Sequence, residues 1–166
     1  MPLELPVFWI VLMNVAGWPA IQLGLAWAFT RMPAEWFHPP QARAFERDGE
    51  FYEQAFAIKR WKDRLPDGAG WVGGGFAKSG LAEKSPVYLK RFISETWRGE
   101  LCHWCAFAFV PVFFLWNPWW ADAVVVFYVL TANLPCILVQ RYNRIRMRRV
   151  LGRIKRSGGP ASRASV

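Results

Sequence analysis

A short run that begins at Glu95 combines two carboxylates, an arginine and a histidine where a basic region gives way to an apolar one. At about 100° per residue in a helix, Glu95, Gly99 and His103 fall on one stripe, which Arg98 and Glu100 flank. An imidazole, whose ordinary pKa is about 6.5, can act as a general base near neutral pH, and a nearby carboxylate can orient it. This run is therefore the first candidate for a catalytic site.

A second set of polar side chains follows the last apolar segment. Asn133, Gln140 and Arg144 recur at helical spacing on one face, and Arg141 and Asn143 lie beside them. An asparagine in a membrane helix often only bonds a neighbouring helix, whereas amide and guanidinium groups can also stabilise an oxyanion or bind a phosphate. Both interpretations stay open from the residues alone.

The third concentration of charge is the basic stretch that contains Lys59, Arg60 and Lys62. Such a stretch can hold anionic lipid headgroups beside a membrane, or it can bind a phosphate-bearing donor. Charge by itself does not separate these two functions.

Charge along the whole chain is segregated in a way that indicates an integral membrane protein. The 166 residues are 54% hydrophobic, yet 21 are Lys or Arg and 12 are Asp or Glu. No Lys or Arg precedes Arg31, and none occurs from Gly99 to Gln140. This alternation is typical of membrane spans and cytoplasmic loops. We expect membrane lipid, and no nucleic acid, as the partner of the basic regions.

The apolar segments have lengths near that needed to cross the roughly 30 Å hydrocarbon layer. We expect three spanning helices, at about 6–30, 101–117 and 121–140. They belong to one all-α domain over 1–156, with a disordered tail at 157–166. The excess of Lys and Arg places 31–100 and the C terminus in the cytoplasm. The chain is thus expected to be a multi-pass protein of the cell membrane.

The cytoplasmic region is expected to be helical and amphipathic. Phe51, Ile58 and Trp61 recur at helical spacing, which predicts one amphipathic helix within 41–65 that lies on the membrane or on the other helices. Further along, Ser85 followed by a proline is typical of a helix N-terminus, and this helix should run into the second span.

The first apolar segment could also be a cleaved signal peptide, because Ala-Trp-Ala at 26–28 resembles a cleavage site. However, it lacks a basic start, and its apolar stretch exceeds the usual length of about 7–15 residues. Asn14, Pro19 and Gln22 within it favour a helix that packs on protein. We therefore interpret it as the first span.

Three blocks of sequence together resemble one known family. They are Lys-Arg-Trp-Lys-Asp-Arg-Leu-Pro at 59–66, Glu95 to Trp104, and Ala-Asn-Leu-Pro-Cys at 132–136 followed by Gln-Arg-Tyr-Asn-Arg at 140–144. The blocks are similar to those of the glycosyl-4,4'-diaponeurosporenoate acyltransferases, small integral membrane enzymes of bacterial carotenoid biosynthesis. The resemblance covers about Pro6 to Arg149, and its last block is the most specific.

The resemblance implies transfer of a fatty acyl group from acyl-CoA, as co-substrate, to a sugar hydroxyl of a glycosylated carotenoid or a related glycolipid. No bound cofactor or metal is implied. For the chemistry, we assign His103 as the base, Glu100 or Glu95 as the group that orients it, and Asn133, Gln140 or Arg98 as oxyanion donors. Contacts to the donor fall to Lys59, Arg60, Lys62, Gln140, Arg141, Asn143 and Arg144.

Two functions of other classes fit the same residues. A metal enzyme could use Glu95, Glu100 and His103 as ligands, since Glu100 and His103 form a Glu-x-x-His pair of the kind that binds metals in helical bundles. However, the sequence holds no second such pair. Alternatively, the chain is a non-catalytic membrane subunit whose basic face binds anionic lipid or a soluble partner. Because three helices enclose little volume, we also consider a homo-oligomer.

Overall fold

The computed structural model describes residues 2–65 and 85–157, and in these residues the only regular elements are helices and helical turns. In chain order they are α1 (Val7–Arg31), η1 (Ala34–Trp36), η2 (Ala44–Gly49), α2 (Glu50–Phe56), η3 (Ile58–Arg60), η4 (Lys62–Arg64), α3 (Pro86–Phe107), α4 (Val110–Phe113) and α5 (Trp119–Ser157), where η marks a 3-10 turn. The predicted all-α class is confirmed. Apart from Ser157, the predicted tail lies outside the described residues.

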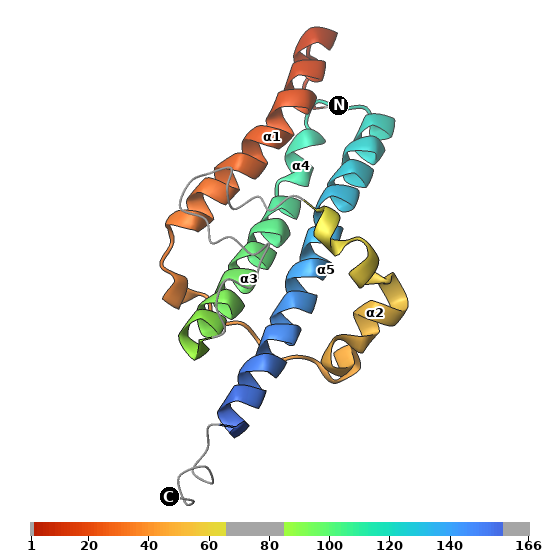
Figure 1. Cartoon of the computed structure of the whole chain (residues 1–166). Coiled ribbons are helices and arrows are strands. Elements are labelled where there is room, and N and C mark those ends of the chain that lie inside the picture. The colour runs from red at the N-terminus through yellow and green to blue at the C-terminus, as the bar shows by residue number, and fades with distance from the viewer. Residues whose placement is uncertain (1, 66–84, 158–166) are drawn as a thin grey trace, which may run out of the picture.

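Three helices run side by side, with α1 packed against α3 and α3 against α5 (Figure 1). The short α4 continues the line of α3, and α2 with its neighbouring turns lies against α5 on the side away from α1. The C-terminal end of α1, the start of α3 and the C-terminal half of α5 lie at the same end of the bundle. The basic segments are therefore gathered at one end.

Separate apolar clusters hold the two halves of the bundle. In the half that contains α4, Trp18, Phe113 and Val129 pack together, with 6.2 Å between the ring centroids of Trp18 and Phe113. In the basic half, α5 packs on α2 through Tyr142 and on α3 through Met147. The long helix α5 is thus the common support of both halves.

A reciprocal amide pair joins α1 to the turn before α5. Asn14 Nδ2 donates to Asn117 Oδ1 at 2.7 Å, and Asn117 Nδ2 donates back to Asn14 Oδ1 at 3.0 Å. Trp116 Nε1 donates to the same oxygen of Asn14 at 3.3 Å. These bonds satisfy polar groups that an apolar environment would otherwise leave unpaired. The first segment therefore packs on the rest of the protein, as its polar residues indicated.

The single amphipathic helix predicted within 41–65 is wrong. Only the seven residues of α2 form an α-helix there. Before it, Arg47, Asp48 and Gly49 have φ angles of 42°, 56° and 98°, and after it Ala57 has φ of 47°. Such left-handed backbone ends a right-handed helix on either side. The periodic pattern did reveal one packing residue, since Ile58 is buried against α5.

The predicted three spans are only partly observed. Two helices, α1 and α5, are long and apolar enough to cross a membrane. The segment 101–117 is not one helix, because α3 ends at Phe107 and α4 covers four residues. Pro111 explains the break: its nitrogen cannot donate to the Phe107 carbonyl, and its ring clashes with that carbonyl in a continued helix. Helix α5 also exceeds its predicted range, since it continues to Ser157.

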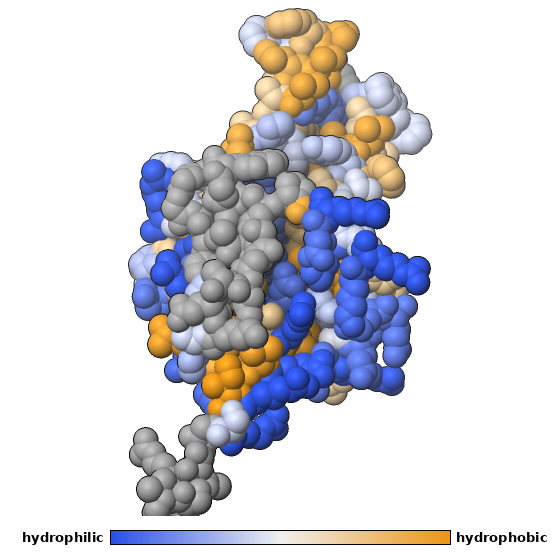
Figure 2. Space-filling view, in the orientation of Figure 1, coloured by the Kyte–Doolittle hydropathy of each residue, from blue (hydrophilic) through white to orange (hydrophobic). Residues whose placement is uncertain are grey.

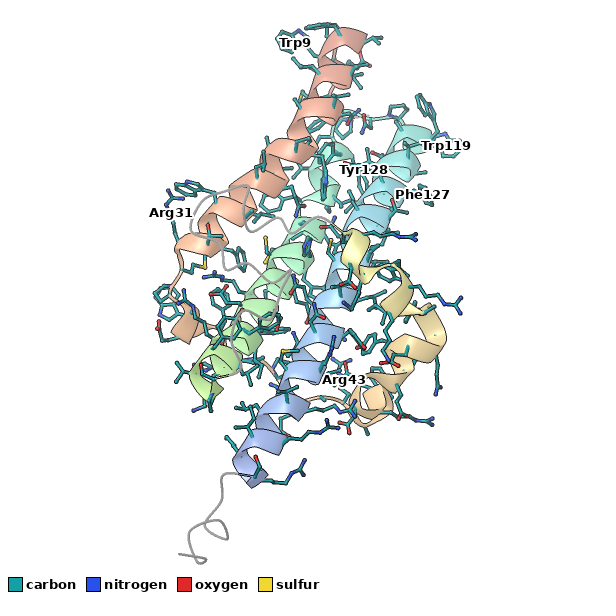
Figure 3. The ribbon with its side chains drawn as sticks, in the orientation of Figure 1. Trp9, Arg31, Arg43, Trp119, Phe127 and Tyr128 are labelled. Atoms are coloured by element: carbon teal, nitrogen blue, oxygen red, sulfur yellow. The ribbon has the colours of Figure 1, made fainter. Side chains whose placement is uncertain are left out.

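Apolar side chains cover the outer surfaces of α1 and α5. Val7 is 75% exposed and Trp119 is 82% exposed. Trp9, Trp119 and Phe127 point away from the bundle (Figure 3). Figure 2 shows hydrophobic residues around the start of α1, whereas hydrophilic residues predominate around α2 and the C-terminal half of α5. Water-soluble monomers rarely expose contiguous apolar surface of this kind.

Candidate active site

The ionisable residues of α3 are divided between two faces of the helix. Glu95 and Arg98 form a buried ion pair on the face toward the end of α1, where Arg98 Nη1 also donates to the Met32 carbonyl at 3.2 Å. Glu100 and His103 instead face α5. The residues that share a stripe in the sequence therefore contact different neighbours.

Glu100 is fully buried and binds two arginines of α5. Its Oε1 accepts hydrogen bonds from Arg141 Nε at 2.5 Å and from Trp104 Nε1 at 3.2 Å. Its Oε2 lies 2.7 Å from Arg144 Nη2, and the Arg144 guanidinium lies over the Trp97 ring. A buried carboxylate needs such cationic partners to offset its loss of hydration. Glu100 therefore joins α3 to α5.

His103 is oriented by Asn133 of α5. The distance from His103 Nδ1 to Asn133 Oδ1 is 2.8 Å, and Asn133 Nδ2 donates to the Val129 carbonyl at 2.9 Å. The bond to the Val129 carbonyl identifies the nitrogen of the Asn133 amide, so the amide oxygen faces the imidazole. Because an amide oxygen only accepts hydrogen bonds, His103 Nδ1 must carry the proton. In the neutral ring the lone pair then lies on Nε2. This is the tautomer that a general base requires.

The sequence contained a signal for this pair. His103 and Asn133 each lie fifteen residues from Pro118, so a chain that folds back at that proline brings them to the same level. From the sequence, Asn133 is expected to face an oxyanion, and Glu100 or Glu95 is expected to orient His103. In the structure Asn133 bonds His103, whereas Glu100 binds Arg141 and Arg144.

The other predicted oxyanion donors lie further from His103. Arg98 is held by Glu95 and the Met32 carbonyl. Gln140 is seven residues beyond Asn133, about 10 Å along the axis of α5. Its Oε1 is buried, and no donor to it is found among the described residues.

Several of the residues predicted to bind the donor phosphates are already paired with acidic side chains. Lys59 pairs with Glu53 at 2.6 Å, and Lys62 pairs with Asp63. Arg60 is exposed and Asn143 is half-buried. Because Arg141 and Arg144 bind Glu100, much of the predicted positive charge already has an anionic partner.

The segment around α2 adds residues that sequence reasoning did not single out. The Tyr52 hydroxyl donates to Glu46 Oε1 at 2.5 Å and also contacts Arg141. Burial, and then the neighbouring Glu46, raises the pKa of Tyr52 well above its usual range. The hydroxyl therefore stays a hydrogen-bond donor, and it contacts Arg141, which also binds Glu100.

Comparison with known proteins decides the family. The family model of glycosyl-4,4'-diaponeurosporenoate acyltransferase matches residues 33–153, which include α2, α3 and nearly all of α5. The chain belongs to this family. Proteins of that name from Staphylococcus aureus strains Newman and USA300 are each 32% identical to it over 145 residues, which cover 85% of this chain and 87% of the relative. No solved structure was found to match.

The chain is therefore an acyltransferase, as the three sequence blocks indicated. The matched region contains every residue that the sequence assigned to the site. Within the described part of this acyltransferase, no group of three or more His, Cys, Asp or Glu side chains is placed to hold a metal ion. The metal-enzyme alternative thus has no ligand set there.

Proposed function

We propose that this acyltransferase moves a fatty acyl group from acyl-CoA to a sugar hydroxyl of a glycosylated carotenoid or a related glycolipid. The acceptor class comes from the names of the relatives. The observation that carries the chemistry is the bond between His103 and Asn133, which leaves Nε2 as the basic nitrogen. Asn133 lies on the apolar side of the bundle, about 10 Å along α5 from Gln140, after which the basic half begins.

In the proposed reaction, His103 Nε2 accepts the proton of the sugar hydroxyl as its oxygen attacks the thioester carbonyl. A new ester bond forms, and the thioester bond breaks when the tetrahedral intermediate collapses. The imidazolium then returns its proton to the departing thiolate. Asn133 holds the ring in one orientation throughout, because its own amide is fixed by the Val129 carbonyl.

We infer that the protein works in the cell membrane. Other parts of the protein leave most of the apolar stretches of α1 and α5 uncovered. The exposed side chains of Val7, Trp119 and Phe127 are examples. Lipid can cover such surface, whereas water cannot do so favourably. The basic end, with 31–100 and the C terminus, would lie in the cytoplasm because Lys and Arg gather there. Helices α3 and α4 would then fill the bundle between the two spans.

The test is mass spectrometry of lipids and pigments from a host strain that lacks the gene and carries a variant at equal protein level. His103→Ala should abolish the O-acylated glycolipid and accumulate its unacylated precursor, since loss of a general base typically lowers a rate about 10²–10⁴-fold. Asn133→Ala should lower the product through misorientation of the ring. Thr131→Val is the control, because that hydroxyl bonds carbonyls of its own helix.

If His103→Ala restores the acylated lipid, the base is assigned wrongly. If no acylated lipid depends on the gene in any strain, the proposed reaction itself is wrong.

A further inference from the structure

A basic hollow lies beside the C-terminal half of α5, away from His103. Its volume is about 400 Å³, and its lining includes Arg148, Arg149, Arg153 and Arg156. These positions recur at helical spacing on one face of α5, and the loop before α2 closes the opposite side through Asp48. Among the described residues that line it, Asp48 is the one acid. The hollow therefore carries an excess of positive charge.

Two of its arginines are held in place by backbone carbonyls, and the Glu46 carboxylate also acts on Arg148. Arg148 Nη1 donates to the Pro40 carbonyl at 2.5 Å, and Arg148 Nη2 donates to the Pro39 carbonyl at 2.8 Å. Arg149 Nη1 donates to the Asp48 carbonyl at 3.0 Å. These partners are backbone carbonyls, so the guanidinium charges stay available to an anion. This differs from Arg141 and Arg144, whose charges face Glu100.

A glycine near the C-terminal end of α5 lines the hollow. Gly152 lies within the helix and lines the hollow, and a Cβ added to it would meet no atom within 4 Å. Glycine is an unfavourable choice in a helix interior, and here no packing contact requires it. The missing side chain does let a ligand approach the backbone closely.

The distance of the hollow from the hydrocarbon layer indicates the kind of ligand that it can bind. From Gln140, where the uncharged part of α5 ends, Arg148 is about 12 Å and Arg156 about 24 Å along the helix axis. The polar layer of a bilayer extends only about 5–8 Å beyond the hydrocarbon. Most of the hollow is thus beyond the lipid headgroups, in reach of a water-soluble anion.

We propose that this hollow binds the phosphate groups of the acyl donor's soluble carrier, coenzyme A. The forked guanidinium groups suit phosphate oxygens. The carrier's flexible arm would then follow α5 toward His103, since Arg148 lies about 22 Å along the axis from Asn133. This inference rests on the proposed function, because it takes acyl-CoA as the donor.

The test measures the affinity of the full chain for coenzyme A by calorimetry, in nanodiscs of neutral phosphatidylcholine. Two variants change the hollow in different ways. Arg153→Glu reverses a charge, and Gly152→Leu fills the space without changing charge. Each should weaken binding roughly tenfold or more. Arg146→Glu is the matched control, because Arg146 is an exposed arginine of α5 that does not line the hollow, and it should bind as the wild type does.

Wild-type affinity in both hollow variants would overturn the proposal. So would variants that keep coenzyme A affinity but lose co-purifying acidic phospholipid, because the hollow would then hold a lipid headgroup.

Acyl transfer assayed on the same samples separates this inference from the reaction itself. His103→Ala should still bind coenzyme A while its turnover is lost. If both hollow variants transfer acyl groups with a wild-type KM for acyl-CoA, coenzyme A does not bind in the hollow, but the proposed reaction is still supported. Binding that depends on the hollow, without acyl transfer in the wild type, supports the hollow and refutes the reaction.

Discussion

Glu100 and His103 are one turn apart on α3, yet their surroundings differ in kind. Glu100 is completely buried and faces the charges of Arg141 and Arg144. His103 is half-buried and bonds a neutral amide. A buried charge must be matched by opposite charge, whereas an imidazole held by an amide can gain and lose a proton at Nε2. At the scale of single residues, Glu100 joins α3 to α5, and His103 is the residue that we propose as the general base.

Replacement of Glu100 by Gln should therefore destabilise the protein. Arg141 and Arg144 would keep their positive charges between α3 and α5 without an anion, which typically costs about 3–5 kcal/mol. The fall in Tm can be followed in detergent by tryptophan fluorescence. Asp63→Asn is the control and should change Tm little, because that carboxylate is exposed and pairs with the neighbouring Lys62. An unchanged Tm with lost activity in Glu100→Gln would instead make Glu100 a participant in the reaction.

Among the elements, α2 acts as a brace for α5. The Tyr52 hydroxyl supports Arg141, and the Tyr142 hydroxyl donates to Glu53 at 2.8 Å. The bonds from Lys59 and Tyr142 lower the pKa of Glu53, which keeps it ionised as their acceptor. The left-handed residues on both sides of α2 shorten it and turn its tyrosine toward α5.

Ala57→Gly should stabilise the protein, because Ala57 caps α2 in a left-handed conformation that favours glycine. The expected gain is about 0.5–1 kcal/mol after the greater flexibility of glycine in the unfolded chain is counted. Gly49→Ala is the converse, since it has φ of 98° and an added Cβ would lie 3.4 Å from the Tyr142 ring. Thermal melts of the two variants should shift in opposite directions. A lower Tm for Ala57→Gly would show that α2 does not need this cap.

The whole molecule has an apolar end and a basic end, and Asn133 lies about 10 Å along α5 from Gln140, after which the basic half begins. Exposed apolar residues cover α1 and the first half of α5, while arginines occupy the second half of α5. This division suits an enzyme that takes a lipid-linked acceptor from one side and a water-soluble donor from the other.

Sided labelling with a membrane-impermeant maleimide checks this arrangement in intact cells. In a background without the native cysteines, Trp119→Cys should be labelled from outside, because this exposed residue lies at the apolar end, where α5 begins. A cysteine at Asp63 should react only after the membrane is opened. A cysteine at Val124, within the expected span, should react in neither state. Labelling of position 63 in intact cells would reverse the proposed orientation.

The sequence determined the features that depend on neighbouring residues. The helical class, the apolar segments at α1 and α5 and the start of α3 all follow from local patterns. The start of α3 shows this directly, since Ser85 Oγ accepts a hydrogen bond from the Tyr88 amide at 3.2 Å. The three blocks that carry the family resemblance are also readable along the chain.

Only the tertiary structure decided which polar groups meet. Helix α3 has α1 on one side and α5 on the other. Glu95 pairs with Arg98 of its own helix, which also bonds the Met32 carbonyl just after α1, whereas Glu100 binds Arg141 of α5. The partner of His103 and the hollow around Gly152 likewise depend on how distant segments pack. Spacing places a side chain on a face of its helix, but the interaction it makes is set by what packs against that face.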